Sequence, residues 1–318
     1  MNLPSPLSHN SPIIRQFKPV EDQWELTDTN IKRIDPETGQ TILHNYCQYI
    51  NTLPLDVFQH LIKIHGCDVN AKDKYKDTPL HYALDCFDPT KGGDITVLLY
   101  LLSQRNVDVD IENRDGYNLL RLACKNINNL SVDVFKSLID TNVCDVNAND
   151  DNDNNIPLFH AFCYFDPELG GDVAVLIYLL SQKMYISNFD RDYLFRQACC
   201  LIDFYPLELF KLLIERHGAD VNEQDGNNET SLQDALHSFN PCTGCDINVL
   251  AYLLNQKTVN VNTKYKKGHT LLHYACVKSF PIWHYLKPKG EECDTFLCQI
   301  VEVIANKCLE LVLDETTS

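Results

Sequence analysis

The sequence has few basic residues and no cluster of them. Its 318 residues include 27 Lys and Arg against 44 Asp and Glu, which gives a formal net charge of −17. The richest basic stretch is residues 264–267, where Tyr265 interrupts the lysines. Because nucleic acids and anionic membrane surfaces are bound through positive patches, we expect this chain to bind neither. The acidity itself favours solubility.

Long apolar runs are also missing. No stretch approaches the roughly 18 apolar residues that a membrane-spanning helix needs. The N-terminus, MNLPSPLSHNSPIIRQ, lacks the charged start and apolar run of a Sec-type signal peptide, so we expect none. Fourteen cysteines are present, and most lie inside the helical motif described below, where a small buried thiol fits well. We therefore expect reduced thiols and a cytoplasmic location.

Motifs for catalysis and cofactor binding are absent as well. The sequence has no Gly-rich phosphate-binding loop, no Ser-centred nucleophile elbow and no kinase or dinucleotide-binding pattern. These absences remove the most common enzyme classes. The sequence therefore predicts no cofactor and no enzymatic activity.

One heptapeptide recurs along the chain at a nearly constant spacing. The seven copies are TILHNYC (41–47), TPLHYAL (78–84), NLLRLAC (118–124), IPLFHAF (156–162), YLFRQAC (193–199), TSLQDAL (230–236) and TLLHYAC (270–276). Successive copies start 37, 40, 38, 37, 37 and 40 residues apart. A fixed period in this range is typical of an array in which each unit packs only against its neighbours.

Residues 73–109 show how one unit is built. Thr78 can cap a helix with its hydroxyl, and Pro79 fits the first helical position because no N–H is needed there. Phe87-Asp88-Pro89 predicts a break, and a second helix is expected to begin near Asp94. The unit is therefore helix, loop, helix and turn.

These features together resemble the ankyrin repeat. The first helix carries the resemblance through the TPLH and following Ala of TPLHYAL, and the repeat ends carry it through HGCDVN (65–70), CDVN (144–147), HGADVN (217–222) and VNVN (259–262). The resemblance covers roughly residues 35–278. It implies an all-α solenoid of about seven helix–turn–helix repeats. Its loops between paired helices are expanded, since the ankyrin period is usually about 33 residues.

Alternate copies share further features, so the true unit is a block of two repeats, near 76 residues long. Even copies carry FDPTKGGD (87–94), FDPELGGD (165–172) or FNPCTGCD (239–246), whereas odd copies carry LDVF (55–58), VDVF (132–135) or LELF (207–210). We expect the expanded loops to form a ridge along one edge. The predicted division is an N-terminal tail and capping helix at 1–34, repeats at 35–278, and an insertion loop with a C-terminal capping helix at 279–318.

The resemblance implies that a partner contacts the concave face made by the first helices, together with the turns between repeats, here called fingers. The residue after the fourth motif position varies among the copies, as a recognition surface should. The candidate contact residues are Tyr82, Asp85, Lys125, His160, Gln197, Asp234 and Tyr274 on the helices, Tyr75, Tyr117 and Tyr265 on the fingers, and Trp283 and Tyr285 in the insertion.

Other groups of residues admit a chemical interpretation that we weigh against a structural one. The motif histidines His44, His81 and His273 sit in different repeats, so they do not converge on one metal, and the resemblance implies that they order neighbouring turns. Cys242 and Cys245 form one C-x2-C pair without a second, which predicts no metal site. The finger at 149–155 lacks the central Gly and distal Glu of a calcium loop.

The predicted function is protein–protein recognition without catalysis. We expect the chain to be a monomer. Arrays of this kind are similar to effectors of intracellular bacteria such as Legionella and Coxiella and to poxviral host-range proteins, which implies a host protein as partner and a role in the host cytosol. The acidic surface favours a basic partner. Two alternatives stay open: an intracellular scaffold, and a small cysteine hydrolase or transferase. The latter would use Cys276, Cys293, Cys298, His273 and His284 near the C-terminus.

Overall fold

The computed structural model describes residues 32–141, 144–148, 156–239, 247–260 and 263. In these residues the chain forms helices joined by loops and turns, with no β-strand and a single isolated bridge between Gln224 and Thr230. None of the described helices is both long enough and apolar enough to cross a membrane. Most of the predicted N-terminal segment 1–34 and all of the predicted C-terminal segment 279–318 lie outside these residues, so this division of the chain stays a prediction.

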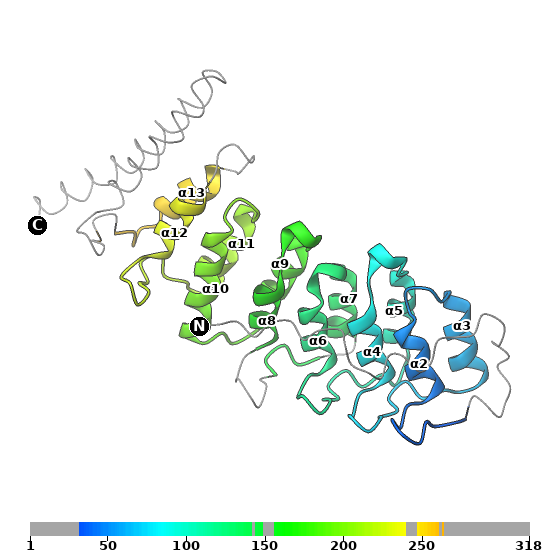
Figure 1. Cartoon of the computed structure of the whole chain (residues 1–318). Helices are drawn as coiled ribbons and strands as arrows, with labels where there is room; N and C mark the ends of the chain where they lie inside the picture. The colour runs from blue at the N-terminus through cyan, green and yellow to red at the C-terminus, as the bar shows by residue number, and fades with distance from the viewer. Residues whose placement is uncertain (1–31, 142–143, 149–155, 240–246, 261–262, 264–318) are drawn as a thin grey trace, which may run out of the picture.

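Two rows of helices run along the molecule (Figure 1). The inner row, which contains the heptapeptide, consists of α2 (Ile42–Gln48), α4 (Pro79–Cys86), α6 (Leu119–Lys125), α8 (Pro157–Tyr164), α10 (Asn188–Cys200) and α12 (Ser231–Ser238). The outer row consists of α3 (Leu55–Gln59), α5 (Ile95–Leu102), α7 (Val132–Lys136), α9 (Val173–Ser181), α11 (Leu207–Lys211) and α13 (Ile247–Leu254). Each inner helix packs on the inner helix before it, in sequence order. The predicted all-α solenoid is confirmed.

Apart from α10, the described inner helices begin where the sequence predicts. Thr78 has extended backbone angles and Pro79 follows as the first helical residue of α4. The ring of His81 then reaches back, so that its Nδ1 atom accepts the Thr78 backbone N–H at 3.2 Å and lies 2.8 Å from the Thr78 hydroxyl. The Thr78 side chain in turn accepts the backbone N–H of His81, so this reciprocal cap satisfies two backbone N–H groups at the start of α4.

The core runs the whole length of the described array as one cluster. Leu80 is 1% exposed and Leu176 is completely buried, and both pack in this cluster. The cysteine at the seventh motif position is fully buried in three copies, Cys47, Cys124 and Cys199. Burial raises the pKa of all three thiols. These cysteines are core residues with inert thiols, as expected; Cys276 lies outside the described residues.

The structure also alternates with a two-repeat period. In odd repeats the outer helix continues into a π-helical turn, at His60–Ile64, Ser137–Thr141 and Leu212–Arg216. In the two even repeats whose expanded loop is described, the loop contains a short 3-10 helix, Pro89–Lys91 or Pro167–Leu169. Each of these two helices ends at a glycine with φ of 94°, Gly92 or Gly170, where any other residue would be strained. The loop of the third repeat also contains a 3-10 helix, Ile127–Asn129, but it ends at Leu130 in an extended conformation. The two-repeat block is thus a structural unit.

The fifth repeat departs from the others. Its inner helix α10 starts early, at Asn188, with Ser187 as the cap, and spans 13 residues instead of seven or eight. The added turns of helix occupy the position of a finger. As a result, α8 and α10 are joined by stacked rings of Phe159 and Tyr193, whose centroids lie 5.0 Å apart.

Candidate protein-interaction surface

The fingers are shaped by a repeated carboxylate or amide turn. In the second finger, Asp73 N–H donates to the Asp77 carbonyl at 3.0 Å, and Asp73 Oδ1 accepts the N–H groups of Tyr75 and Asp77. Asn113 closes the third finger in the same way and Asp225 the sixth. The side chain at this position therefore stabilises the turn of the finger, so the side chains at its tip are not needed for this purpose.

The first three fingers are also joined to one another through their backbones. Lys74 N–H donates to the carbonyl of Thr38 at 2.9 Å, and Arg114 N–H donates to the carbonyl of Tyr75 at 2.8 Å. Tyr75, a predicted contact residue, is 41% exposed between these two links. Its position relative to its neighbours is consequently fixed before any partner arrives.

The fourth motif position carries a bond from each repeat to the next. His44 Nε2 lies 3.0 Å from the carbonyl oxygen of Asp77, and His81 Nε2 lies 3.0 Å from that of Tyr117. Because Nδ1 of each ring accepts a backbone N–H, the proton resides on Nε2, which donates to the carbonyl. Burial lowers the pKa of His81 to about 4, so the ring is neutral at physiological pH. The structural interpretation of these two histidines is confirmed.

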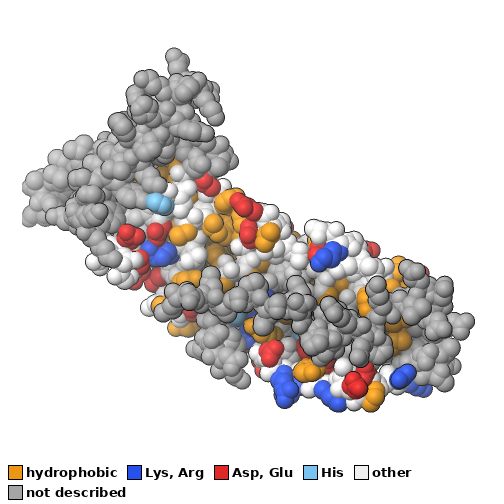
Figure 2. Space-filling model, in the orientation of Figure 1, with side chains coloured by type: hydrophobic (Ala, Val, Ile, Leu, Met, Phe, Trp, Pro, Cys, Tyr) orange, Lys and Arg blue, Asp and Glu red, His pale blue; other side chains and the backbone are white. Residues whose placement is uncertain are grey.

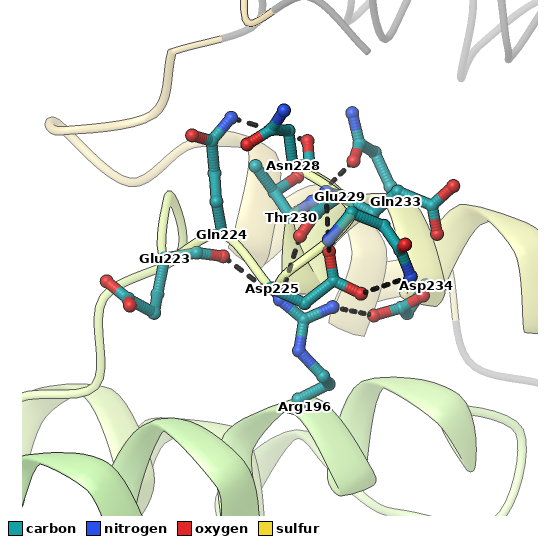
Figure 3. Close-up of polar contacts among 10 residues, drawn as sticks. Arg196, Glu223, Gln224, Asp225, Asn228, Glu229, Thr230, Gln233 and Asp234 are labelled. Atoms are coloured by element: carbon teal, nitrogen blue, oxygen red, sulfur yellow. Dashed lines mark hydrogen bonds and ion pairs between the residues drawn. The ribbon is translucent and has the colours of Figure 1, made fainter. Parts of the chain in front are cut away.

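Arginine replaces histidine at this position in two repeats. Arg121, which is 1% exposed, donates from Nη2 to the carbonyl of Ala148 at 2.9 Å and from Nη1 to that of Gly116 at 2.6 Å. Arg196 donates from Nη2 to the carbonyls of Glu223 and Glu229 and from Nη1 to the Asp234 carboxylate (Figure 3). In both cases the longer side chain makes the same connection between repeats as the imidazole.

Asparagines supply two further lines of connection, both with the two-repeat period. Asn51 donates to the carbonyl of Cys86 and accepts the N–H of Asp88, at 2.7 and 2.8 Å. Asn128 repeats the pattern with Tyr164 and Asp166, at 2.8 Å each. At the opposite edge, Asn70, Asn147 and Asn222 each bond backbone groups of the following repeat. The expanded loops are therefore clasped rather than loose.

Tyr82 has a structural task in addition to its predicted one. It is half-buried, and its hydroxyl donates to Asp73 Oδ2 and accepts from Gln40 Nε2, both at 2.8 Å. Burial is the main reason that the pKa of Tyr82 is raised, followed by the bond to Asp73. The ring links its own helix to two fingers, so only part of it is available to a partner.

The other predicted contact residues differ widely in exposure. Asp85 is exposed, whereas Lys125 is half-buried with its ammonium 5.6 Å from the centroid of the Tyr117 ring. His160 is only 8% exposed and lies edge-on to Tyr117 and parallel to Tyr164, at centroid distances of 6.2 and 6.4 Å. This row of rings crosses the inner face of the third and fourth repeats.

Two further predicted residues are half-buried on the next helices. Gln197 lies on α10, and Asp234 on α12 is paired with Arg196. Tyr265, Tyr274, Trp283 and Tyr285 lie outside the described residues. So do the finger at 149–155, Cys242, Cys245, His273 and the cysteines and histidine of the alternative hydrolase site.

Several exposed apolar side chains were not predicted as contact residues. Leu169 is 69% exposed, Phe204 47%, Tyr185 79% and Phe189 78%. An alignment of the repeat copies could have identified Leu169 and Phe204 from the sequence. Leu169 aligns with Lys91 in the other described even loop, and Phe204 aligns with Thr52 and Asn129 in the odd loops. An apolar residue in a loop position that is polar in its sister copies indicates a surface of its own.

Family comparisons identify the repeat. A family model described as ankyrin repeats (3 copies) matches residues 196–296, and the single ankyrin-repeat model matches residues 75–114. The chain contains ankyrin repeats. The seven-copy motif and the stacked helix pairs extend this repeat type across the described array.

The similar curated proteins are poxviral. Ankyrin repeat protein OPG189 of variola virus is 29% identical over 222 residues, which are 69% of this chain and 35% of the viral protein. The putative ankyrin repeat protein FPV244 of fowlpox virus is 36% identical over 85 residues, 27% of this chain and 11% of the relative. The chain thus spans about a third of the length of the variola relative. These relatives match the poxviral resemblance in the sequence.

The comparison with solved structures matches another ankyrin repeat domain. The ankyrin repeat domain of Bcl-3, described as a unique member of the IkappaB protein family, matches with a TM-score of 0.45 and 19% identity, over 74% of this chain and 94% of that domain.

Proposed function

We propose that the ankyrin array is a non-catalytic module that holds a protein partner on its concave face. The surface would consist of the inner helices α2 to α12 with the fingers beside them. The observation that carries the proposal is that different positions serve structure and recognition. The residues at motif position four and the asparagines make the hydrogen bonds between repeats, whereas the exposed residues between them differ from copy to copy.

Chemical variety on a rigid support is what recognition of one partner requires. On α4 the exposed residue is Asp85, and its equivalent on α6 is Lys125; farther along, the equivalents are Cys163, Cys200 and His237. Tyr75, Tyr117 and Tyr164 add aromatic surface, which loses little conformational entropy on binding, and the buried His160 lies behind the last two. These residues would supply the contacts, while the hydrogen bonds made by motif position four and by the asparagines hold the repeats in place.

The poxviral relatives support a partner in the infected cell. On that basis the partner would be a host protein and the chain would act in the host cytosol as a monomeric effector. The chain's net charge of −17 would speed the encounter with a basic partner.

Affinity capture from a lysate of cells that a poxvirus infects tests the concave face. The test variant reverses one acid and one base there, Asp85→Arg with Lys125→Glu. The matched control reverses one of each on the outer helices, Asp56→Arg with Lys136→Glu, and both control residues are exposed. We expect the concave variant to lose the captured protein and the control to keep it. Equal recovery with both variants, at equal thermal stability, would rule out the concave face.

A further inference from the structure

A second surface lies on the ridge formed by the expanded loops, away from the fingers. Its apolar centre is Leu169, Phe204 and Pro206, all exposed, and its rim is Glu168, Asp172 and Glu208, also exposed; we call these six residues the ridge patch. Figure 2 shows hydrophobic side chains with acidic ones among them over the part of the molecule where α9 and α11 lie. A leucine that is 69% exposed at the end of an ordered loop is not explained by packing.

The loop that carries Leu169 is held rigidly. Asp166 caps the 3-10 helix Pro167–Leu169 by accepting the N–H of Glu168 at 2.8 Å, and Asn128 accepts the N–H of Asp166 at 2.8 Å. The backbone at Gly171 packs so closely that an added Cβ would lie 2.7 Å from Asn128 Oδ1. Leu169 therefore projects from a fixed base, with little entropy to lose when a partner covers it.

The loop that carries Phe204 is packed against the first loop. The ring of Tyr205, next in the chain, lies 5.5 Å from the ring of Phe165 and 6.3 Å from that of Phe162, and Tyr205 is 4% exposed. This buried neighbour anchors residues 201–206 beside residues 165–171. Phe204 and Leu169 thus belong to adjoining segments of one ridge.

The segments that form the ridge patch carry charge of one sign. Residues 163–182 and 197–210 contain five acidic residues, Asp166, Glu168, Asp172, Asp203 and Glu208, and no Lys or Arg; Lys183 and Lys211 follow directly after these two ranges. Arg196, the closest arginine in sequence, is bound to finger carbonyls and Asp234 on the other edge of the array. Lys211, one turn beyond Glu208, lies over the ring of Tyr252 on α13.

From this arrangement we propose that the ridge patch binds a basic segment of a protein partner that carries two or three large apolar residues between Lys or Arg residues. The apolar side chains cover Leu169 and Phe204, and the cations pair with Glu168, Asp172 and Glu208. The sister even loop does not share this property. There Lys91 replaces Leu169 and forms an ion pair with Asp88 at 2.8 Å, which excludes an apolar partner of the same kind.

The test uses the full chain and three labelled peptides: KRLLFRK, its acidic twin EDLLFDE, and KRSSNRK without the apolar centre. The variant Leu169→Lys with Phe204→Thr places the side chains of the sister loops on the same backbone, so its fold should be retained. We expect the wild type to bind KRLLFRK best and the variant to bind it at least about tenfold more weakly. Glu168→Lys with Glu208→Lys should weaken it as well and remove its dependence on salt.

Matched controls separate this proposal from the preceding one. Glu37→Lys with Glu112→Lys reverses two exposed acids on the fingers, and Asp85→Arg with Lys125→Glu alters the concave face; both should leave KRLLFRK binding unchanged. No binding of KRLLFRK by the wild type at about 1 mM would overturn the ridge proposal. Equal binding of the acidic twin, or unchanged binding by the Leu169 and Phe204 variant at equal melting temperature, would do the same. Loss of a dimer in that variant, by sedimentation, would assign the patch to self-association instead.

Discussion

The Nε2 atom of His81 donates a hydrogen bond to the carbonyl oxygen of Tyr117, 3.0 Å away in the following repeat. His44 makes the same bond to Asp77 one repeat earlier. In an ankyrin array each repeat contacts only its neighbours, so the cooperativity of folding depends on such contacts between adjacent repeats. The predictions below each change one of these connections.

The first prediction concerns acid. Burial lowers the pKa of His81 to about 4 from its ordinary 6.5, so between these values the unfolded chain binds a proton that the folded chain does not. The contribution of neutral His81 to stability is therefore lost as the pH falls below about 6.5. His81→Gln removes the titration, and the Gln233 cap at Thr230 shows that glutamine can cap at this position.

Urea unfolding at several pH values measures the effect. Relative to His81→Gln, the wild type should lose on the order of 2 kcal/mol between about pH 6.5 and 4.5. Burial raises the pKa of Asp77 to about 6, which acts in the opposite direction over the same range, and the comparison with the variant removes this contribution. Parallel pH profiles of the two proteins would refute the buried neutral histidine.

The second prediction concerns the clasp at Asn128. Asn128→Ala removes the donor to Tyr164 and the acceptor for Asp166, and leaves these backbone groups without that partner. Unfolding free energy should fall by about 1–3 kcal/mol, and amide exchange should speed up in residues 165–171. Asn129→Ala, which loses one bond to Asn126 in its own repeat, is the control and should cost less.

The third prediction concerns glycine. A Cβ at Gly171 would lie 2.9 Å from the backbone oxygen of Asp166 and 2.8 Å from the Phe165 ring, so Gly171→Ala should destabilise the array by about 1–3 kcal/mol. A Cβ added at Gly226 would meet no atom within 4 Å, and Gly226 has no positive φ, so Gly226→Ala should be nearly neutral. Thermal unfolding of the two variants side by side measures the difference, and similar melting temperatures would contradict the close contact.

The fourth prediction concerns Arg196. Arg196→Gln removes the bonds to the carbonyls of Glu223 and Glu229 and the ion pair with Asp234, so the sixth finger loses its attachment to α10. We expect a loss of about 1–3 kcal/mol and faster amide exchange at Asn227 and Glu229. The control is Arg191→Gln, because the hydrogen bonds of Arg191 to Asn188 and Asp192 stay within its own helix.

Sequence reasoning predicted the fold well because the array is built from local and repeated features. The heptapeptide, the Thr78-Pro79 start of α4 and the alternation of odd and even loops depend on residues close together in the chain. In a solenoid each unit contacts only the next, so a periodic sequence also determines the order in which the helices stack. Fold class and most helix positions followed from these features, and the structural role of His44 and His81 followed from the resemblance to the ankyrin repeat.

The surface could not be predicted to the same depth, because exposure depends on what the neighbouring repeat places beside each residue. Tyr82 and His160 occupy the same motif position, yet one is half-buried in a hydrogen-bond network and the other is 8% exposed within a row of rings. Arg196 replaces the motif histidine and donates to the Glu229 carbonyl, the equivalent of Asp77, whereas Arg121 donates to the carbonyl of Ala148, the equivalent of Ala71.

The amino-acid sequence by itself determined the repeat, its helix N-caps and the alternation of odd and even repeats, since these depend on local backbone preferences and on apolar periodicity. Only the tertiary structure decided which side chains tie the repeats together and which remain exposed. The reason is that contacts between repeats join residues 27 to 42 positions apart, as at Arg121 with Ala148 and Tyr82 with Gln40. Their distances follow from the packing of whole helices.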